Sequence, residues 1–293
     1  MHGHKSHRGH WLGLGIRVAR LLCCQPERTG KLVRGSYDRI AEGYDDAWTH
    51  HMRDLSLRLL EQVSPPNGTN GLDLTCGTGF VTAELNRRTG RRTVGVDSSG
   101  GMLEIARCKY GERCDFVQAD AVDYLRCCPR NSIDIVTCAW GLGYSRPLAV
   151  VREISRVLRP GGRVGVIDNT LFSLAGVIWA SVLAFAEHPS ALRHAMQVRF
   201  LPASCVLAAI MRASGLAVRA AYDGSRTYHV PDGRAAIDRL TATGAAAGFE
   251  FAAEEEQREE VFERFTEIIE RTCMTDRGVA ITHRYLAAVG EKR

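Results

Sequence analysis

The sequence predicts an α/β fold: a doubly wound, mostly parallel seven-stranded sheet with helical insertions. Apolar stretches with the pattern of buried strands alternate with stretches of helical periodicity between residues 71 and 168. The first of these strands contains Asp73 and runs into a turn with Gly77 and Gly79, after which a helical pattern begins at Phe80. Such a strand–turn–helix unit presents backbone N–H groups to a ligand at a helix N-terminus.

The elements follow in order along the chain. A helical region from Gly35 towards Val63 ends at strong turn signals, residues 65–68, before the first strand. After residue 168 the alternation breaks, and we expect helical additions at about 171–214 and 231–273. Residues 171–186 carry no charge but are shorter than the about 20 residues that span a bilayer, so they predict a buried helix over an apolar pocket. A polar helix is expected near 189–199 and another helix at about 202–213. The seven predicted strands are 71–76, 92–97, 114–118, 133–138, 163–168, 216–222 and 281–289.

Charge divides the chain into an arm and a body. Residues 1–34 carry seven lysines and arginines against one glutamate, whereas the rest is close to neutral. This distribution predicts a basic N-terminal arm, 1–34, and one domain, 35–293, and it argues against a broad nucleic-acid footprint on the body. Four histidines within residues 1–10 fit a disordered arm. The ten cysteines lack the spacing of disulfides or zinc ligands, so we expect reduced thiols, no metal site and a cytoplasmic location.

Residues 11–24 of the arm are apolar apart from Arg17 and Arg20. A basic amphipathic helix of this kind can lie on an anionic membrane surface, which predicts peripheral membrane contact. Two alternatives stay open: an Arg-rich leader, or a helix packed on its own domain or on a partner protein.

The acid in the first strand discriminates between ligands. Asp73 would repel a pyrophosphate bound over the turn, whereas it would favour a ligand that carries an ammonium and a sulfonium. The dinucleotide fingerprint also fails, because Thr82 stands at the third glycine position, and no Gly-Lys-Ser/Thr follows for a phosphate-binding loop. S-adenosylmethionine fits this pattern. Asp97, at the end of the second strand, is placed to hold a ribose diol, although it could instead cap the next helix.

Together these motifs resemble the class I S-adenosylmethionine-dependent methyltransferases, which have a Rossmann-like fold. The resemblance covers about residues 35–170, with Thr75 standing where relatives more often have Gly or Ala. The stretch 139–145 lacks the Asn-Pro-Pro-Tyr motif of methyltransferases for adenine amino groups and glutamine. The segments that carry the likeness are 72–79, Asp97, 118–121 and 158–162, and 37–45 (Tyr-Asp-Arg-Ile-Ala-x-x-Tyr-Asp) resembles the ubiquinone/menaquinone-biosynthesis type.

The resemblance implies a pocket for S-adenosylmethionine, with S-adenosylhomocysteine as the product. The implied cofactor residues are Tyr37 and Tyr44 as a lid, Asp73 for the methionine ammonium, Cys76, Gly77, Thr78 and Gly79 for the methionine and ribose edge, Asp97 for the ribose hydroxyls, Ser98, Met102, Asp120 and Ala121 around the adenine, and Cys138 and Ala139 as the floor. Both tyrosines could instead be core aromatics.

Four further residues are candidates for the acceptor side. Trp140 and Tyr144 follow the fourth strand, and Asp168 and Asn169 end the fifth, although packing or strand-end capping could explain each of them. No general base can be assigned.

We therefore expect an enzyme that methylates a small hydrophobic acceptor, such as a quinol, a lipid or an aromatic or polyketide-like ring. The apolar segment 171–186 and the amphipathic arm motivate this expectation. One alternative is an RNA or protein methyltransferase that docks through the arm. Another is a non-catalytic S-adenosylmethionine-binding protein that acts through partners. The acceptor atom and the oligomeric state stay open.

Overall fold

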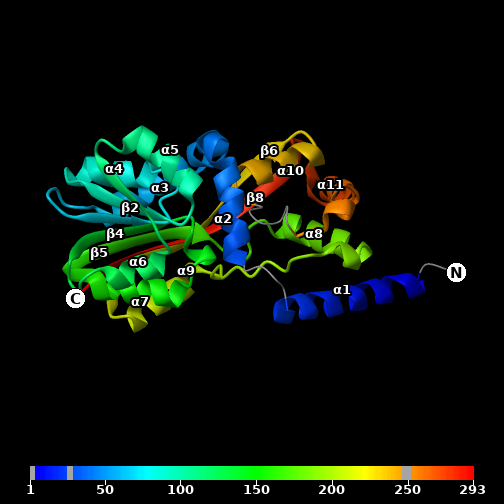
Figure 1. The fold of residues 1–293 in the computed structure, drawn as a ribbon, viewed down its shortest axis with the longest axis horizontal. Coiled ribbons are helices and arrows are strands. Elements are labelled where there is room, and N and C mark those ends of the chain that lie inside the picture. The colour runs from blue at the N-terminus through cyan, green and yellow to red at the C-terminus, as the bar shows by residue number, and fades with distance from the viewer. Residues whose placement is uncertain (1–3, 25–28, 246–251) are drawn as a thin grey trace. The chain divides into compact units, whose positions relative to one another are not determined.

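The computed structural model describes residues 4–24, 29–245 and 252–293 (Figure 1). The chain forms two compact units. The helical unit comprises Met1–Ser36, Leu174–Gln197 and Arg226–His283, and the sheet unit comprises Tyr37–Ser173, Val198–Ser225 and Arg284–Arg293. This division differs from the expected arm and single domain, because the arm residues cluster with much of the two helical additions.

The sheet has the predicted α/β topology. Its order is β3-β2-β1-β4-β5-β8-β6, and a short β7 pairs with β8. The strands β1 to β5 pair in parallel, whereas β8 runs antiparallel to β5. The prediction of seven strands, mostly parallel, is confirmed for the main path, and β7 was not predicted. The strands are β1 (Gly71–Leu74), β2 (Thr93–Asp97), β3 (Cys114–Gln118), β4 (Ile133–Ala139), β5 (Leu158–Asn169), β6 (Leu216–Val230), β7 (Met274–Thr275) and β8 (Gly278–Lys292).

The centre of this sheet explains the apolar runs in the sequence. Strand β1 is buried along its whole length, since it lies between β2 and β4 and helices cover both faces. Leu72 is in register with Val94 on one side and with Val136 on the other. The strand order reverses between β1 and β4. In open parallel sheets, ligands bind at the carboxyl ends of the strands at such a switch point.

Helices cover the two faces of the sheet unit, as Figure 1 shows: α3, α4 and α5 lie over one face, and α6, α7 and α9 over the other. Two apolar cores result, one on each face. The helical elements of this unit are η1 (Ala41–Gly43), η2 (Asp45–Thr49, a π-helix), α3 (His50–Val63), α4 (Phe80–Thr89), α5 (Gly100–Tyr110), α6 (Ala121–Cys127), η3 (Leu142–Tyr144), α7 (Pro147–Val157) and α9 (Ser204–Ala213).

The helical unit has its own core, in which α8 packs against α1 and α11. Leu14 and Leu21 of α1 are buried there together with Ile268 of α11. The helical elements are α1 (His4–Cys24), α2 (Thr29–Ile40, whose last residues belong to the sheet unit), α8 (Ala175–Glu187), η4 (Pro189–Ala191), α10 (Gly233–Ala242), η6 (Glu255–Gln257) and α11 (Arg258–Cys273).

Several expectations for these parts of the chain were wrong. Residues 4–10, for which the histidines suggested disorder, belong to helix α1, the helix predicted for residues 11–24 lies within α1 as well, and residues 1–3 lie outside the described part. The polar helix near 189–199 is replaced by the single turn η4, which starts at Pro189. The expected buried helix over 171–186 starts at Ala175, and Trp179 on it is exposed. Within the described residues, no helix combines the length and the apolar character needed to cross a bilayer.

Candidate cofactor and active site

The turn after β1 has the geometry that its glycines allow. Gly77 and Gly79 have φ angles of +53° and +87°, in the left-handed region that suits glycine. A Cβ atom on Gly79 would also lie only 3.0 Å from the Phe116 ring. Gly79 occupies the N-cap position of α4 and offers no side chain there. The backbone of the turn can therefore approach a ligand closely at the helix N-terminus.

Asp73 lies beneath this turn and is fully buried. Its Oδ1 accepts a hydrogen bond from the Thr137 hydroxyl and its Oδ2 one from the Thr82 hydroxyl, both at 2.7 Å. Burial raises the pKa of Asp73 to about 7, although both threonine hydrogen bonds lower it in part. Because both oxygens already accept protein hydroxyls, the carboxyl would act on a ligand mainly through its charge. Thr82, which breaks the dinucleotide fingerprint, is thus a partner of Asp73.

Asp97 lies beside the turn at the end of β2. Its Oδ2 accepts a hydrogen bond from the Gly77 N–H and its Oδ1 one from the Ser99 N–H, each at 2.9 Å. Burial raises the pKa of Asp97, and these backbone hydrogen bonds lower it in part. The N-cap of α5 is Ser99, whose hydroxyl accepts from the Met102 N–H, so Asp97 is not that helix's cap. Each Asp97 oxygen keeps a second lone pair that can accept a ribose hydroxyl.

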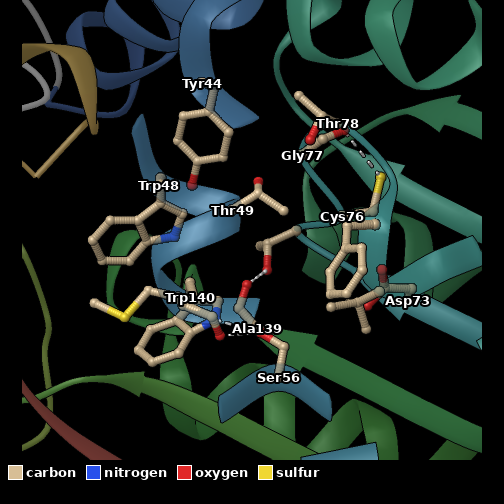
Figure 2. A pocket seen from close by; sticks show the side chains of 14 residues that line it. Tyr44, Trp48, Thr49, Ser56, Asp73, Cys76, Gly77, Thr78, Ala139 and Trp140 are labelled. Atoms are coloured by element: carbon tan, nitrogen blue, oxygen red, sulfur yellow. Dashed lines mark hydrogen bonds between the residues drawn. The ribbon is translucent and has the colours of Figure 1, made fainter. Parts of the chain in front are cut away.

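A shallow hollow opens beside Asp73, at the carboxyl ends of β1 and β4 (Figure 2). Its lining includes one acid and four aromatic rings, and no Lys, Arg or His among the lining residues that the structure describes. This lining suits a positively charged ligand and disfavours a polyphosphate. The lining residues are Tyr44, Trp48, Thr49, Met52, Ser56, Asp73, Thr75, Cys76, Gly77, Thr78, Phe80, Val81, Ala139 and Trp140.

One side of the hollow is formed by one face of a helical segment, of which only the first residue was predicted as a site residue. Tyr44, Trp48, Met52 and Ser56 all line the hollow and follow one another at intervals of four residues. This spacing places side chains on one face of a helix, here along η2 and α3. The signal was therefore present in the sequence, although only Tyr44 was identified from it.

Tyr37 and Tyr44 pack together, with ring centroids 5.9 Å apart, and Tyr37 makes an equally close contact with Tyr144. Burial raises the pKa of Tyr144 to about 12, so its hydroxyl stays protonated at neutral pH. Of this cluster, Tyr44 alone lines the hollow as described. The lid role of the tyrosines stays a prediction, while their packing on one another matches the core alternative.

Asp38 and Asp45, which follow Tyr37 and Tyr44, connect residues 37–45 to the loops of the site through hydrogen bonds. Asp38 Oδ1 accepts hydrogen bonds from the Ser99 hydroxyl, at 2.6 Å, and from the Gly101 N–H, at 3.0 Å. Neither aspartate was identified from the sequence as a site residue, because only the fold shows their partners.

Asp45 is bonded to the Thr49 and Thr78 hydroxyls and to the Lys109 ammonium. Burial acts to raise the pKa of Asp45, but these three hydrogen bonds, led by that of Lys109, outweigh it and lower the pKa below its usual value. The bond to Thr78 ties η2 directly to the glycine turn.

Two residues at the floor of the site have unusual backbones. Thr75 and Trp140, at the ends of β1 and β4, have φ angles of +55° and +64°. Side chains larger than glycine are strained there, by roughly 1–3 kcal/mol each, and such strain collects at functional sites. The Thr75 hydroxyl donates to the Leu74 carbonyl at 2.6 Å, and the Trp140 Nε1–H donates to the Ser56 hydroxyl at 2.9 Å.

The other implied cofactor residues do not line the hollow. Asp120 is exposed and caps α6, since its Oδ1 accepts from the Val122 N–H at 2.8 Å. Ser98 is exposed as well. Met102, Ala121 and Cys138 are buried. Their roles around an adenine, or as the floor, stay predictions.

The acceptor-side candidates divide in the same way. Trp140 lines the hollow, whereas Tyr144 packs with Tyr37. Asp168 is buried and accepts hydrogen bonds from the Gly143 N–H at 2.6 Å and from the Asn169 N–H at 2.8 Å. Burial raises its pKa to about 7. The Asn169 side-chain oxygen, Oδ1, accepts from the Ser173 hydroxyl at 3.1 Å. Asp168 and Asn169 thus hold the ends of β4 and β5, as the capping alternative expects.

Comparison with known proteins agrees with this geometry. The family model of a methyltransferase domain matches residues 72–162. The demethylmenaquinone methyltransferase of Lactococcus lactis is 36% identical over 120 residues, which are 39% of this chain and 47% of that protein. That of Clavibacter sepedonicus is 34% identical over 143 residues, 46% of this chain and 54% of that protein. The chain thus spans about half the length of these curated relatives.

A solved structure shows the same fold. The YcgJ protein of Bacillus subtilis superposes with a TM-score of 0.55 at 18% identity, covering 82% of this chain and 99% of that one. The methyl donor that this likeness implies is S-adenosylmethionine, and the one acid and the aromatic rings of the hollow fit its positive charges. Residues 72–162 therefore match a methyltransferase domain and are similar to the quinone-biosynthesis methyltransferases, and the sheet around them has the same fold as YcgJ.

Proposed function

We propose that this chain transfers a methyl group from S-adenosylmethionine to a small hydrophobic acceptor. One observation carries the proposal: the hollow at the switch point of a methyltransferase domain combines a buried acid with four aromatic rings and has no cationic residue in its described lining. A positively charged donor and an apolar acceptor are the ligands that this chemistry accommodates best.

The chain's own residues would hold the donor at four points. The Asp97 carboxylate has free lone pairs for the ribose hydroxyls, and the backbone of residues 76–79 can approach the methionine edge. The buried Asp73 would supply negative charge beneath the turn when a cationic donor binds, because a nearby positive charge favours the ionised carboxyl. The rings of Tyr44 and Trp140 line the hollow where a sulfonium would be stabilised by aromatic faces.

The reaction asks little covalent chemistry of the protein. The donor supplies a methyl group on a positively charged sulfur, which an acceptor atom displaces in line. The chain's contribution is then to align the two molecules and to exclude water. Asp38 and Asp45 serve this end as positioning residues, because they fasten the segment that carries Tyr44 to the loops around the turn.

The aromatic lining also supports the choice of acceptor. Trp48 and Trp140 meet edge to face, with centroids 5.6 Å apart, and Met52 lines the hollow beside them. A ring such as a quinol can pack against these side chains. The relatives named demethylmenaquinone methyltransferase favour the same class of acceptor. Asp168 has a pKa of about 7, but it does not line the hollow, so we assign no base.

The donor half of the proposal is tested by calorimetry with S-adenosylmethionine, S-adenosylhomocysteine and NAD. We expect the first two to bind and NAD not to bind. Asp97→Ala should weaken donor binding about 100-fold, since two ribose hydroxyls lose a charged acceptor. Asp115→Ala is the matched control, because Asp115 lies exposed on the neighbouring strand β3, paired with Arg92. Binding of NAD alone, or equal affinities of the two variants, would refute the assignment.

The acceptor half is tested with labelled donor and a panel of acceptors: a naphthoquinol with and without a prenyl chain, a phenolic ring, a phospholipid, RNA and a protein extract. Label in the quinol or the phenol supports the proposal. Label in RNA or protein contradicts it in favour of a macromolecular substrate. Donor binding without label in any acceptor would favour a non-catalytic role.

A further inference from the structure

Helix α1 is apolar on two opposite sides. Leu14 and Leu21 face the core of the helical unit and are buried. Leu12 and Ile16, four residues apart on the opposite side, are 66% and 62% exposed. A surface helix of a globular protein normally carries polar residues on the side away from its core. Its own fold therefore accounts for only one of the two apolar sides of α1.

Helix α8 extends this exposed apolar surface. Trp179 is 53% exposed, and the helix has no charged residue before Glu187 at its end. The ring of Trp179 stacks on that of Trp11 in α1, with centroids 6.0 Å apart, which joins the two helices into one surface. We call this surface the apolar face; it consists of Trp11, Leu12, Ile16, Leu22, Ile178 and Trp179.

The charges on the described side chains of α1 have one sign. Residues 10–24 contain Arg17 and Arg20 and no Asp or Glu, whereas the acids near α8, Glu187 and Glu260, are paired with Arg264 and His188. Arg20 is exposed and follows Ile16 by four residues, so it borders the face. Arg17 points the other way: its Nε–H donates to the Leu192 carbonyl at 2.7 Å, and its guanidinium pairs with Glu254.

We propose that the helical unit docks on an anionic lipid bilayer through the apolar face, with α1 and α8 lying in the plane of the interface. Apolar side chains that enter the acyl region, tryptophans at the headgroup level and a basic border are the features that bind a helix to such a surface. A second copy of the chain fits less well, because residues 10–24 of its α1 contain no acid to pair with Arg20, whereas an anionic bilayer supplies negative charge. The docking is independent of whether the chain transfers methyl groups.

The test is co-sedimentation of the full chain with vesicles of phosphatidylcholine alone or mixed with phosphatidylglycerol. We expect binding to the mixed vesicles that weakens as salt rises. The double variant Leu12→Ser/Ile16→Ser should bind at least about tenfold more weakly, because two apolar side chains no longer leave water. Arg20→Gln should lower binding to the anionic vesicles about fivefold. Leu148→Ser is the control: Leu148 is equally exposed, at 55%, but lies on α7 of the sheet unit, so binding should not change.

A second measurement identifies which tryptophans contact the lipid. Vesicles with brominated lipid should quench the tryptophan fluorescence of the wild type and of Trp48→Phe, and quenching should be lost in Trp11→Phe/Trp179→Phe. Circular dichroism verifies that each variant is folded. The proposal is overturned if the wild type does not bind anionic vesicles, if Leu12→Ser/Ile16→Ser binds as well as Leu148→Ser, or if the apolar face instead forms a dimer that the same double variant dissociates.

Discussion

In folded proteins, charged residues are normally exposed and large apolar residues are normally buried, and the two units depart from this rule in opposite ways. The sheet unit buries acids: Asp73 and Asp168 lie almost without exposure among the strand ends. The helical unit exposes large apolar side chains, such as Leu12 and Trp179. Each departure has a free-energy cost that a purely structural protein would avoid. The difference is the one expected if the two units meet the surroundings proposed above: a small, positively charged ligand at the buried Asp73, and the apolar region of a bilayer at the exposed apolar face.

The largest expected effect concerns Asp73. Its folded pKa of about 7 lies above the ordinary value near 3.9, so its stabilising contribution is complete below about pH 4 and is lost as pH rises through 7. Asp73→Asn should remove this loss, which is at most about 4 kcal/mol of unfolding free energy. Urea unfolding of both proteins between pH 4 and pH 8 checks it. Parallel pH profiles of the two would show that the carboxyl is not held protonated by burial.

Asp45 should give the opposite pH dependence. Its folded pKa is lowered, so its contribution is present above the ordinary value and is lost as pH falls through the folded pKa. Asp45→Asn should therefore lose about 1 kcal/mol at pH 7, a small value because Lys109 is 42% exposed and water screens the pair. The deficit should vanish in acid, as measured by the same unfolding series. Asp46→Asn, on an exposed neighbour, is the control.

Thr75 offers a smaller and favourable change. Thr75→Gly should raise the free energy of unfolding by roughly 1–2 kcal/mol, because it relieves the strain of a positive φ angle. It should also lower that free energy by about 0.5–1 kcal/mol, because glycine gives the unfolded chain more conformational freedom. The expected net effect is a stabilisation of about 1 kcal/mol or less, seen as a rise in Tm. Thr75→Ala keeps a Cβ atom at the strained position and should show no gain. A destabilised glycine variant would mean that the threonine side chain holds the floor in place.

The smallest effect is expected on the apolar face. Leu12→Ser should change the unfolding free energy by no more than about 0.5 kcal/mol, because its side chain is exposed and contributes little to the core. Leu14→Ser, on the buried side of the same helix, should cost several times more. Thermal unfolding of the two variants compares them directly. Similar losses would show that both sides of α1 are buried in solution and would remove the basis of the comparison.

The sequence revealed most of the sheet, because parallel strands buried on both faces read as apolar runs between turn residues. It also located Asp73, Asp97 and the glycine turn, whose spacing is local. Asp38 and Asp45 were not recognised as site residues, since their partners lie 61 and 33 residues further along the chain, at Ser99 and Thr78. The polarity of residues 189–199 predicted a helix that the structure lacks. An apolar pattern also could not tell which sides of α1 and α8 are covered, because that depends on the rest of the helical unit.

The attachment of the tyrosine segment by Asp38 and Asp45 has a kinetic consequence. If Tyr44 acts as the predicted lid, a donor bound beneath it would exchange with solvent only after the hydrogen bonds of Asp38 and Asp45 to Ser99, Thr78 and Lys109 break. Departure of the spent donor would then be slow relative to the displacement at carbon, and a pre-steady-state burst of methylated product would precede the steady rate. A substitution that removes the hydrogen bonds of Asp38 or of Asp45 would raise the steady-state rate of turnover and reduce the amplitude of the burst.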